Sequence, residues 1–456
     1  MPSSANISSA APAPSEHLSS GRTAADRTLT ALRVLLRSSH LAGPDDLPAL
    51  VSAAGAELGA GPAVLYLVDY DQVELMPLTV GQTTPGTPSA AGAPPTVAVP
   101  EDAADSPLVI NSTLAGRTYS DLTQHTIATP VGCTVWTPVL DGTERLGVLR
   151  LDFPHAADDL EPDLLDGFED VAALLAELVV TRSLYGDAVE RTRRRGQMTV
   201  PAELAHRLLP PLTFVSPRAS IAGALAPAGQ AAGDTFDYAL NGDTLHVAIF
   251  DAMGHGLQAA LLASVAVGAL RNARRAGLDL AATANSIDYN LAGQFDAGTF
   301  VTGIIGELDL TSGSWRWTTC GHAPALLVRH GRVVKQLDAV TDPPLGLTLL
   351  GEPQIGAERL QPGDRLLLHT DGVAEARNGA GHFFGTERLV EFTSRQAAAG
   401  RPAAETLRRL NHAILDHQDG SLQDDATTVM IEWLSDQPRR AAPAIAASPH
   451  GVDGHS

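Results

Sequence analysis

Four aspartates with similar surroundings are the residues of this 456-residue chain best suited to chemistry. They are Asp234 in AAGDTFD, Asp251 in IFDAMGHG, Asp371 in LLHTDGV and Asp424 in LQDDATTVMI. The last three adjoin apolar, strand-like runs, and glycine closely follows Asp251 and Asp371, where it lets other groups approach the backbone. Carboxylates at strand ends suit hard cations such as Mg²⁺ or Mn²⁺, whereas without a cation they would repel one another and any anionic substrate.

The turn after Asp251 offers a further oxygen ligand. Its glycines permit tight turns between the expected strand and a long helix, which leaves the carbonyl group of Ala252 free to bind a cation. The pair Asp424-Asp425 places two carboxylates side by side, and at ~4 Å with an effective dielectric constant of about 20 these repel by about 4 kcal/mol. Any one of these aspartates could be an ordinary turn or cap residue, but all four together predict a metal site.

Two cations in such a site favour hydrolysis of a phosphate ester. They hold the phosphoryl oxygens and lower the pKa of a bound water from about 15.7 towards ~7, which supplies hydroxide without a protein nucleophile. We therefore expect direct attack by metal-activated water and no covalent phosphoenzyme. The alternative from another class is a non-catalytic scaffold that binds its partner without turnover. A kinase or ATPase is disfavoured, because the chain has no GxxxxGK[ST] loop.

The bulk composition narrows the class of partner and the compartment. The formal net charge of -21 argues against nucleic acid or an anionic membrane as the main partner. The two cysteines, Cys133 and Cys320, can form neither a disulfide framework nor a zinc-ligand motif, which fits a reducing cytoplasm. The N-terminus lacks a secretory signal pattern, and the longest apolar stretch, 257–270, is shorter than the ~20 residues of a membrane span. We therefore expect a soluble cytoplasmic protein.

Composition and periodicity divide the chain into three structured parts between two tails. Residues 1–26 and 436–456 are rich in small and polar residues and are expected to be disordered. Residues 27–185 are predicted to form an α/β domain, 186–211 a helical linker, and 212–435 a second domain with many strands.

The first domain combines helices with a strand pair, a long loop and a hairpin. The Asp141-Gly142 pair between two alternating apolar runs indicates the hairpin. The other expected elements are helices at 28–39 and 47–58, strands at 63–68 and 73–78, and a Pro/Gly/Thr-rich loop at 82–100.

A regular apolar stripe marks the helix that follows the hairpin. Spacings of four and three residues separate Leu164, Phe168, Val171, Leu175 and Leu178, and the register continues through Arg182, Tyr185 and Val189. Such spacing is typical of a coiled-coil seam and predicts a homodimer through this helix, but it also fits an amphipathic helix packed on its own sheet. In a seam, ligand-induced rotation would move a short linker helix at 202–209 against the metal site.

The linker carries a basic run at 191–195 in an otherwise acidic chain. This run is most simply a solvated helix face or a salt-bridged segment. The short helix at 202–209 would be closed by the prolines that follow it.

The second domain alternates groups of strands with a few helices. Asn241-Gly242 is a tight-turn signal between two of the strands. Strands are expected at 221–225, 235–240, 245–250, 300–310, 314–320, 325–329, 365–370 and 427–433, and helices at 257–276, 281–292, 386–399 and 403–416. Helices inserted between strand groups suggest a sheet-on-sheet core with helices outside.

Seven ordered motifs connect the four aspartates to a known family. They are GDTFDY, DAMGHGLQAALL, FVTGIIGELDLTSG, CGHAPALL, PPLGL, TDGVAEA and DDATTVMI. Over residues 212–433 the chain resembles the bacterial branch of the metal-dependent PP2C-type protein phosphatases, the SpoIIE/RsbU-like group that dephosphorylates anti-sigma-factor antagonists. The resemblance implies a β-sandwich flanked by helices, two Mn²⁺ or Mg²⁺ ions, and a phosphoprotein of a partner-switching pathway as substrate.

The resemblance also implies a role for each site residue. The metal-binding and catalytic positions would be Asp234, Asp251, Asp371 and Asp424, with the carbonyl group of Ala252 as a further ligand. Around them, metal-bound waters would be held by Asp237 and Asp425. The two histidines, His255 and His322, would either donate to phosphate or stabilise glycine-rich turns.

The chain departs from the family pattern at three places. It has AGD for the usual GGD, Thr319-Cys320 where an asparagine often precedes AGH, and Ala252 where many relatives have glycine. A carbonyl ligand does not depend on its side chain, and all four acidic positions are present, so these changes do not imply loss of activity.

The first domain resembles a GAF sensor domain, with a PAS-like domain as the alternative. The resemblance rests on its helix, strand pair, long loop, the segment VWTPVLDGTERLGVLRLDF and a long exit helix. It implies an unknown small ligand. The expected fold class is α+β: a GAF-like α/β domain, a helical linker, and a PP2C-like β-sandwich flanked by helices. The expected function is a serine/threonine protein phosphatase regulated by the GAF-like domain.

Overall fold

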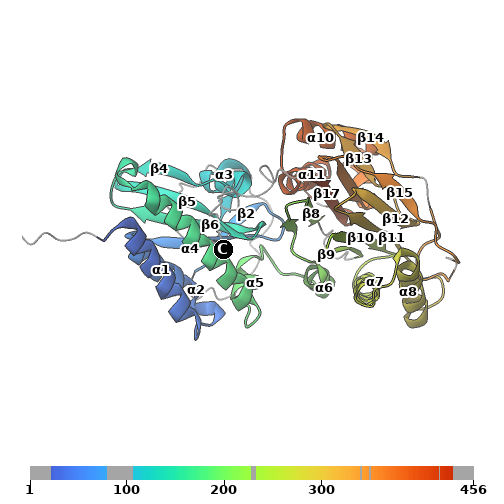
Figure 1. The fold of residues 1–456 in the computed structure, drawn as a ribbon, viewed down its shortest axis with the longest axis horizontal. Coiled ribbons are helices and arrows are strands. Elements are labelled where there is room, and N and C mark those ends of the chain that lie inside the picture. The colour runs from blue at the N-terminus through green and yellow to red at the C-terminus, as the bar shows by residue number, and fades with distance from the viewer. Residues whose placement is uncertain are drawn as a thin grey trace, which may run out of the picture.

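The computed structural model describes residues 22–79, 106–226, 233–338, 341–348, 351–420 and 422–434. Two domains lie side by side, with the N-terminal domain at the left of Figure 1 and the C-terminal domain at the right. The loop expected at 82–100 and the tail expected at 436–456 lie outside the described residues. The first helix begins at Ala24, so the final residues of the tail expected at 1–26 are helical instead. Among the described residues, no helix combines the length and apolar character needed to cross a membrane.

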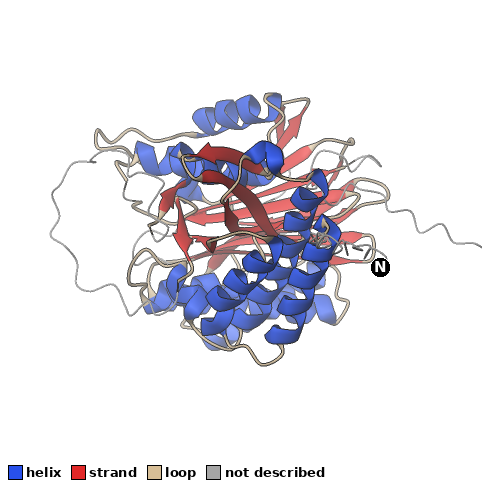
Figure 2. Cartoon of the chain, turned by 90° about the vertical axis from the view of Figure 1, so that its left-hand side faces the viewer, coloured by secondary structure: helices blue, strands red, loops and turns tan. Residues whose placement is uncertain are grey.

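The N-terminal domain is built on a six-stranded antiparallel sheet. In sheet order the strands are β3 (Leu108–Val109), β2 (Glu74–Pro77), β1 (Ala63–Val68), β6 (Glu144–Phe153), β5 (Gly132–Asp141) and β4 (His125–Thr129). One face packs against α1 (Ala24–Ser39), α2 (Leu47–Leu58) and α4 (Pro162–Ser183), and the other against α3 (Leu114–Asp121). Figure 2 views the molecule from this end and shows the helices layered against the strands.

Strand β1 shows why the sequence predicted this sheet. Because successive side chains point to opposite faces, Leu65 and Leu67 enter the core beneath α1, α2 and α4, whereas Tyr66 and Val68 enter the core beneath α3. Both faces are covered, so the strand is apolar throughout its length. The predicted hairpin at Asp141-Gly142 joins β5 to β6, and its glycine has a φ of 59°.

The coiled-coil interpretation of the stripe on α4 is wrong. Its five apolar residues, from Leu164 to Leu178, are all buried in the core that α4 shares with α1, α2 and the sheet. Helix α4 ends at Ser183, Tyr185 is 74% exposed, and Val189 lies in a separate helix, α5 (Ala188–Thr192). The five stripe residues are therefore covered within one chain, which confirms the amphipathic alternative for this helix, whereas the homodimer stays a prediction.

The linker contains two short helices, and the basic run that begins in the first of them, α5, is tied to the N-terminal domain. The basic run is salt-bridged: Arg191 contacts Asp45 at 3.0 Å, and Arg195 contacts Glu74 at 3.1 Å. Arg193 donates to the carbonyl oxygen of Val68 at 3.0 Å. The second helix, α6 (Val200–Leu208), is the one expected at 202–209, and the side chain of its N-cap residue accepts a backbone hydrogen bond.

Two antiparallel sheets pack face to face in the C-terminal domain. The five-stranded sheet has the order β15 (Gly356–Arg359), β12 (Ser314–Cys320), β11 (Val301–Asp309), β10 (Thr244–Ala252) and β9 (Asp234–Asn241). The six-stranded sheet has the order β14 (Arg332–Gln336), β13 (Leu326–Arg329), β16 (Arg365–His369), β17 (Ala426–Trp433), β8 (Ala219–Ala226) and β7 (Thr213–Val215). Their facing side chains form one apolar core, as the sheet-on-sheet expectation required.

Helices cover the outer faces of both sheets (Figure 1). The five-stranded sheet packs against α7 (Leu257–Arg275) and α8 (Leu280–Gln294), and the six-stranded sheet against α10 (Thr386–Ala398) and α11 (Ala403–His417). Strand β10 serves both layers, because Val247 and Ile249 enter the core between the sheets while Ala248 and Phe250 face α7 and α8.

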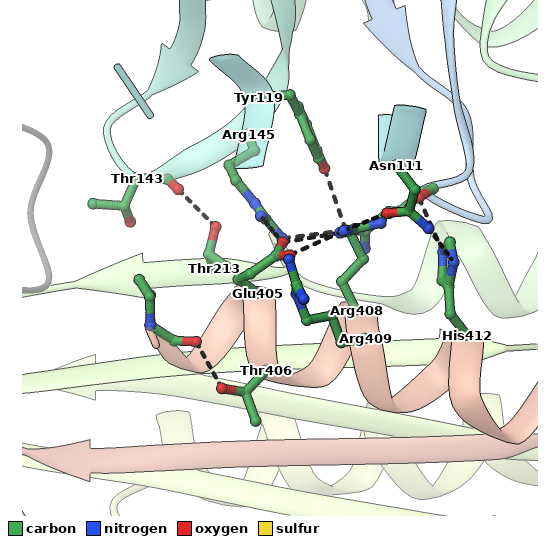
Figure 3. A network of polar contacts seen from close by, with 12 residues as sticks. Asn111, Tyr119, Thr143, Arg145, Thr213, Glu405, Thr406, Arg408, Arg409 and His412 are labelled. Atoms are coloured by element: carbon green, nitrogen blue, oxygen red, sulfur yellow. Dashed lines mark hydrogen bonds and ion pairs between the residues drawn. The ribbon is translucent and has the colours of Figure 1, made fainter. Parts of the chain in front are cut away.

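The two domains meet at the outer face of α11, through a buried ionic cluster drawn in Figure 3. Glu405 accepts from Arg408 at 2.9 Å, from Arg409 at 2.6 Å, and from Arg145 of β6 at 3.3 Å. The exposed fractions of Arg145, Glu405 and Arg408 are 7%, 2% and 2%. Burial alone would raise the pKa of Glu405, but the hydrogen bonds and charges of Arg408 and Arg145 hold it at about 2.

Further polar contacts surround this cluster. Arg408 donates to the side chain of Asn111 at 2.9 Å (Figure 3). Arg145 donates to the side chain of Gln72 at 3.3 Å. On β7, Thr213 donates from its backbone to Glu144 at 2.6 Å and from its hydroxyl to the carbonyl oxygen of Thr143 at 2.8 Å. The interface is thus held largely by hydrogen bonds and ion pairs.

Candidate metal centre

The ends of four strands bring the predicted aspartates to one end of the sandwich. Asp234 opens β9 and Asp251 lies near the end of β10, and the antiparallel register places the two directly opposite each other. In the other sheet, Asp371 follows β16 and Asp424 precedes the neighbouring antiparallel strand β17. Because adjacent antiparallel strands end and begin at the same edge, each sheet contributes two carboxylates there.

Two hydrogen bonds show that the two sheets meet at these residues. The hydroxyl of Thr370 donates to Oδ2 of Asp234 at 2.6 Å, and the backbone N–H of Gly233 donates to Oδ2 of Asp425 at 2.9 Å. Both bonds cross from the five-stranded to the six-stranded sheet. The structure therefore brings all four predicted carboxylates into one locality.

The pKa values of the carboxylates record their burial and mutual repulsion. Burial, followed by the charges of Asp251 and Asp425, raises the pKa of Asp234 well above its ordinary value. Burial, followed by the charges of Asp371 and Asp424, raises the pKa of Asp251 to about 7. Burial is also the main cause of the raised pKa values of Asp371 and Asp424. The protein alone therefore stabilises these charges poorly.

This donor set fits hard divalent cations. All the side-chain donors are carboxylate oxygens, which Mg²⁺ and Mn²⁺ prefer, and their unfavourable proximity is what a cation would offset. Within the ranges that the structure describes, no three His, Cys, Asp or Glu side chains already form a ligand cluster around one point. The fit thus rests on the chemistry of the donors and on their shared locality.

The turn between β10 and α7 has the backbone geometry that its glycines predicted. Gly254 and Gly256 have φ values of 88° and 73°, which strongly favour glycine. A Cβ atom on Gly233 would lie 2.7 Å from the carbonyl oxygen of Ala252, so that oxygen sits against the glycine that precedes Asp234. The predicted carbonyl ligand thus lies beside the carboxylates.

The predicted water-holding role of Asp237 does not fit its surroundings. Its Oδ1 accepts from Arg271 at 2.7 and 2.9 Å, and its Oδ2 accepts from Arg274 at 2.8 Å. It lies three residues along β9 from Asp234 and is 1% exposed. Asp237 therefore anchors α7 to β9, a role that its sequence position did not reveal because both arginines lie more than thirty residues away.

The two histidines differ in their surroundings. His255 is exposed, and its charge lowers the pKa of Asp424 against the larger effect of burial. His322 is 8% exposed, its Nδ1 lies 2.9 Å from the hydroxyl of Thr302, and burial lowers its pKa to about 3. Of the two, only His255 therefore lies where it could reach a phosphate in solvent, whereas His322 is a buried, neutral side chain beside Thr302.

Sequence reasoning did not identify the two residues that hold Asp234. Nothing in the sequence marks Thr370, the residue before Asp371, as a site residue, and the family resemblance implies that Asp425 holds a metal-bound water. In the structure, Asp425 is 3% exposed and accepts from the backbone of Gly233 and Asp234. The available signal was the position of each polar residue immediately beside a predicted ligand.

Comparison with known proteins matches the C-terminal domain. Residues 241–434 match the model of the family described as stage II sporulation protein E (SpoIIE). That segment includes Asp251, Asp371 and Asp424, and it begins just after Asp234.

Three relatives illustrate the similarity. The chain is 23% identical over 206 residues to phosphoserine phosphatase RsbU of Bacillus subtilis, covering 45% of this chain and 60% of RsbU. It is 29% identical over 145 residues to protein IcfG of Synechocystis, covering 32% of this chain and 22% of IcfG. A solved structure of the RsbU and RsbW domains of a Mycobacterium tuberculosis protein is 29% identical with a TM-score of 0.42, covering 48% of this chain and 63% of that one. The chain thus spans less than two thirds of the length of each.

We expect replacement of Asp251 by asparagine to stabilise the metal-free protein at neutral pH. The pKa of Asp251 is about 7 in the folded protein and 3.8 ordinarily, so the folded state binds this proton more tightly. Its contribution to stability is therefore greatest at low pH and is lost as the pH rises through about 7. Asp251→Asn should raise the free energy of unfolding by about 1–3 kcal/mol at a pH of about 7.5 and change it little at about 4.5.

Urea unfolding of chelator-treated protein at the two pH values measures this difference. Excess Mn²⁺ should reverse the order at the higher pH, because the cation stabilises the wild type more than the variant. Equal stability of variant and wild type in metal-free buffer at both pH values would show that the carboxylates do not repel one another as described.

Proposed function

Because residues 241–434 form a SpoIIE-family domain, we propose that this protein is a Mn²⁺- or Mg²⁺-dependent serine/threonine protein phosphatase. The observation that carries the proposal is the gathering of four carboxylates, two from each sheet, at one end of the sandwich, with burial and mutual repulsion raising their pKa values. Asp234 is buried and Asp251 is half-buried, while Asp371 and Asp424 are exposed. Carboxylates gathered in this way destabilise the fold unless a cation offsets their repulsion.

Each residue of the site has a distinct proposed role in binding the cations or the phosphoryl group. Asp234, Asp251, Asp371 and Asp424, with the carbonyl oxygen of Ala252, would hold two cations. Bound cations supply neutralising charge for a phosphoryl group and an acidified water for its hydrolysis. The exposed His255 stands where it could donate to the phosphoryl oxygens. No side chain is required as a nucleophile, so turnover would leave no covalent phosphoenzyme.

The substrate we propose is a phosphoserine- or phosphothreonine-bearing protein, of the kind represented by anti-sigma-factor antagonists in partner-switching pathways. Support comes from the similarity to a protein named phosphoserine phosphatase RsbU and to a structure that joins RsbU and RsbW domains. The formal net charge of -21 makes the cations necessary for binding such an anionic substrate.

Release of phosphate from p-nitrophenyl phosphate and from a phosphoserine protein tests the proposal. We expect turnover with Mn²⁺ or Mg²⁺, its loss with chelator, and a fall of at least about 100-fold in Asp251→Asn and Asp371→Asn, because removal of a ligand should exceed the 10–100-fold effect of an outer partner. Circular dichroism should show both variants folded. Metal-independent turnover, trapped phosphoenzyme, or no turnover by folded wild type would contradict the proposal, and the last result would favour the scaffold.

We also propose that the N-terminal domain is a GAF-like sensor, and that a small ligand bound to it regulates the metal centre. Two contacts support this regulation. The linker helix α6 is joined to the C-terminal domain by Arg271, which donates both to the carbonyl oxygen of Leu208 and to Asp237 of β9. The ionic cluster around Glu405 joins the N-terminal sheet to α11, which ends at His417, seven residues before Asp424.

We expect replacement of Arg145 by methionine to loosen the contact between the domains and to lower activity severalfold. Glu405 keeps Arg408 and Arg409, so the C-terminal domain remains folded while the docking weakens by about 1–3 kcal/mol. Amide hydrogen exchange should become faster in α11 and in the segment leading to Asp424. The matched control is Arg150→Met, which removes an arginine paired with Asp152 on the same strand, within the N-terminal domain. Exchange and activity equal to those of the control would contradict this route.

A further inference from the structure

We infer that Thr370 and Asp425 are positioning residues that hold Asp234 in place for the metal centre. The inference rests on the proposed function and assigns a task to two residues that contact neither a cation nor a substrate in that account. Each of them is the chain neighbour of a predicted ligand: Thr370 precedes Asp371, and Asp425 follows Asp424.

The hydrogen bonding of Thr370 fixes the direction of its proton. Its hydroxyl is fully buried, accepts from the backbone N–H of Thr427 at 3.0 Å, and lies 2.6 Å from Oδ2 of Asp234. A hydroxyl carries one proton, and the N–H of Thr427 already points at its oxygen, so that proton is directed to the carboxylate. A donated hydrogen bond of this length favours the ionised carboxylate that a cation requires.

Asp425 holds the same residue from its backbone side. Its Oδ2 accepts from the N–H of Gly233 at 2.9 Å and lies 3.5 Å from the N–H of Asp234. Thr370 therefore binds the side chain of Asp234, and Asp425 binds the backbone at Gly233 and Asp234. Both residues belong to the opposite sheet's end of the site.

The two segments that carry Thr370 and Asp425 also contact each other. A Cβ atom on Gly372 would lie 1.9 Å from the carbonyl oxygen of Asp425, so the TDG turn and the DDA strand start are in direct backbone contact. In both pairs of neighbours, Thr370-Asp371 and Asp424-Asp425, one residue is a predicted ligand. The other residue of the pair forms a hydrogen bond at Asp234 or at Gly233 beside it. The six-stranded sheet thus supplies two ligands and also sets the position of a ligand from the five-stranded sheet.

Calorimetric titration of the full chain with Mn²⁺, without substrate, tests this division of roles. We expect Thr370→Val, which keeps the shape but removes the hydroxyl, to weaken Mn²⁺ binding by about 10–100-fold. Thr370→Ser keeps the hydroxyl and should remain within about 3-fold of wild type. The matched control is Thr393→Val, at a buried threonine of α10, which should bind Mn²⁺ as the wild type does.

Substitutions of Asp425 separate the effect of its hydrogen bond to Gly233 from the effect of its charge. They also test the inference if Thr370→Val does not fold. Asp425→Asn keeps an acceptor oxygen for the N–H of Gly233 and should bind Mn²⁺ nearly as wild type, whereas the shorter side chain of Asp425→Ser should weaken binding about 10-fold or more. Wild-type affinity in folded Thr370→Val, or equal weakening in Asp425→Asn and Asp425→Ser, would overturn the inference. A wild type that binds no Mn²⁺ would instead overturn the proposed function, and the inference with it.

Discussion

Repulsion among carboxylates at one end of the sandwich is the constraint on which the rest of the structure depends. Asp234 and Asp251 face each other across a strand pair, and the other sheet adds Asp371 and Asp424 at the same end. Asp234 is buried and Asp251 half-buried, which removes much of the water that would screen their charges, so the pKa values of these two residues rise. The fold must supply the free energy that keeps the carboxylates together, and its packed sheets and backbone ladders are the source.

The core, the hydrogen bonds between the sheets and the neighbouring helices together position the carboxylates. The core between the sheets fixes how far apart their strand ends lie, and the bonds of Thr370 and Asp425 to Asp234 and Gly233 join the sheets where the charges gather. Helix α7 follows Asp251 in the chain, and its Arg271 donates to the carbonyl oxygen of Leu208 in the linker. Helix α11 precedes Asp424, and its Glu405 accepts from Arg145 of the N-terminal domain. Because the contact at Glu405 is polar, its separated surfaces would be well hydrated, which suits an interface that opens and closes.

Much of the fold follows from local patterns. Both-face burial made β1 and β10 apolar runs, the Asp141-Gly142 and Asn241-Gly242 turns marked two hairpins, and the four aspartates were found from their types and strand-end positions. The short strands β4, β7, β14 and β15 were missed, because edge strands of a few residues with one exposed face carry little apolar signal.

The remaining errors concern contacts distant in sequence. The stripe on α4 has the same spacing whether it packs on its own sheet or on a second copy, so periodicity could not identify its partner. Asp237 looked like a site residue because it is three residues from Asp234, yet arginines from α7 occupy it. The Glu405 cluster joins residues 260 positions apart and has no sequence signature.

The most direct test of the central claim is the location of bound metal in crystals of the full chain grown with Mn²⁺. Anomalous scattering should show two Mn²⁺ ions among Asp234, Asp251, Asp371 and Asp424, with the carbonyl oxygen of Ala252 bound to one of them. Crystals with saturating Mn²⁺ in which these carboxylates bind no ion, or in which the ions lie elsewhere in the domain, would contradict the account.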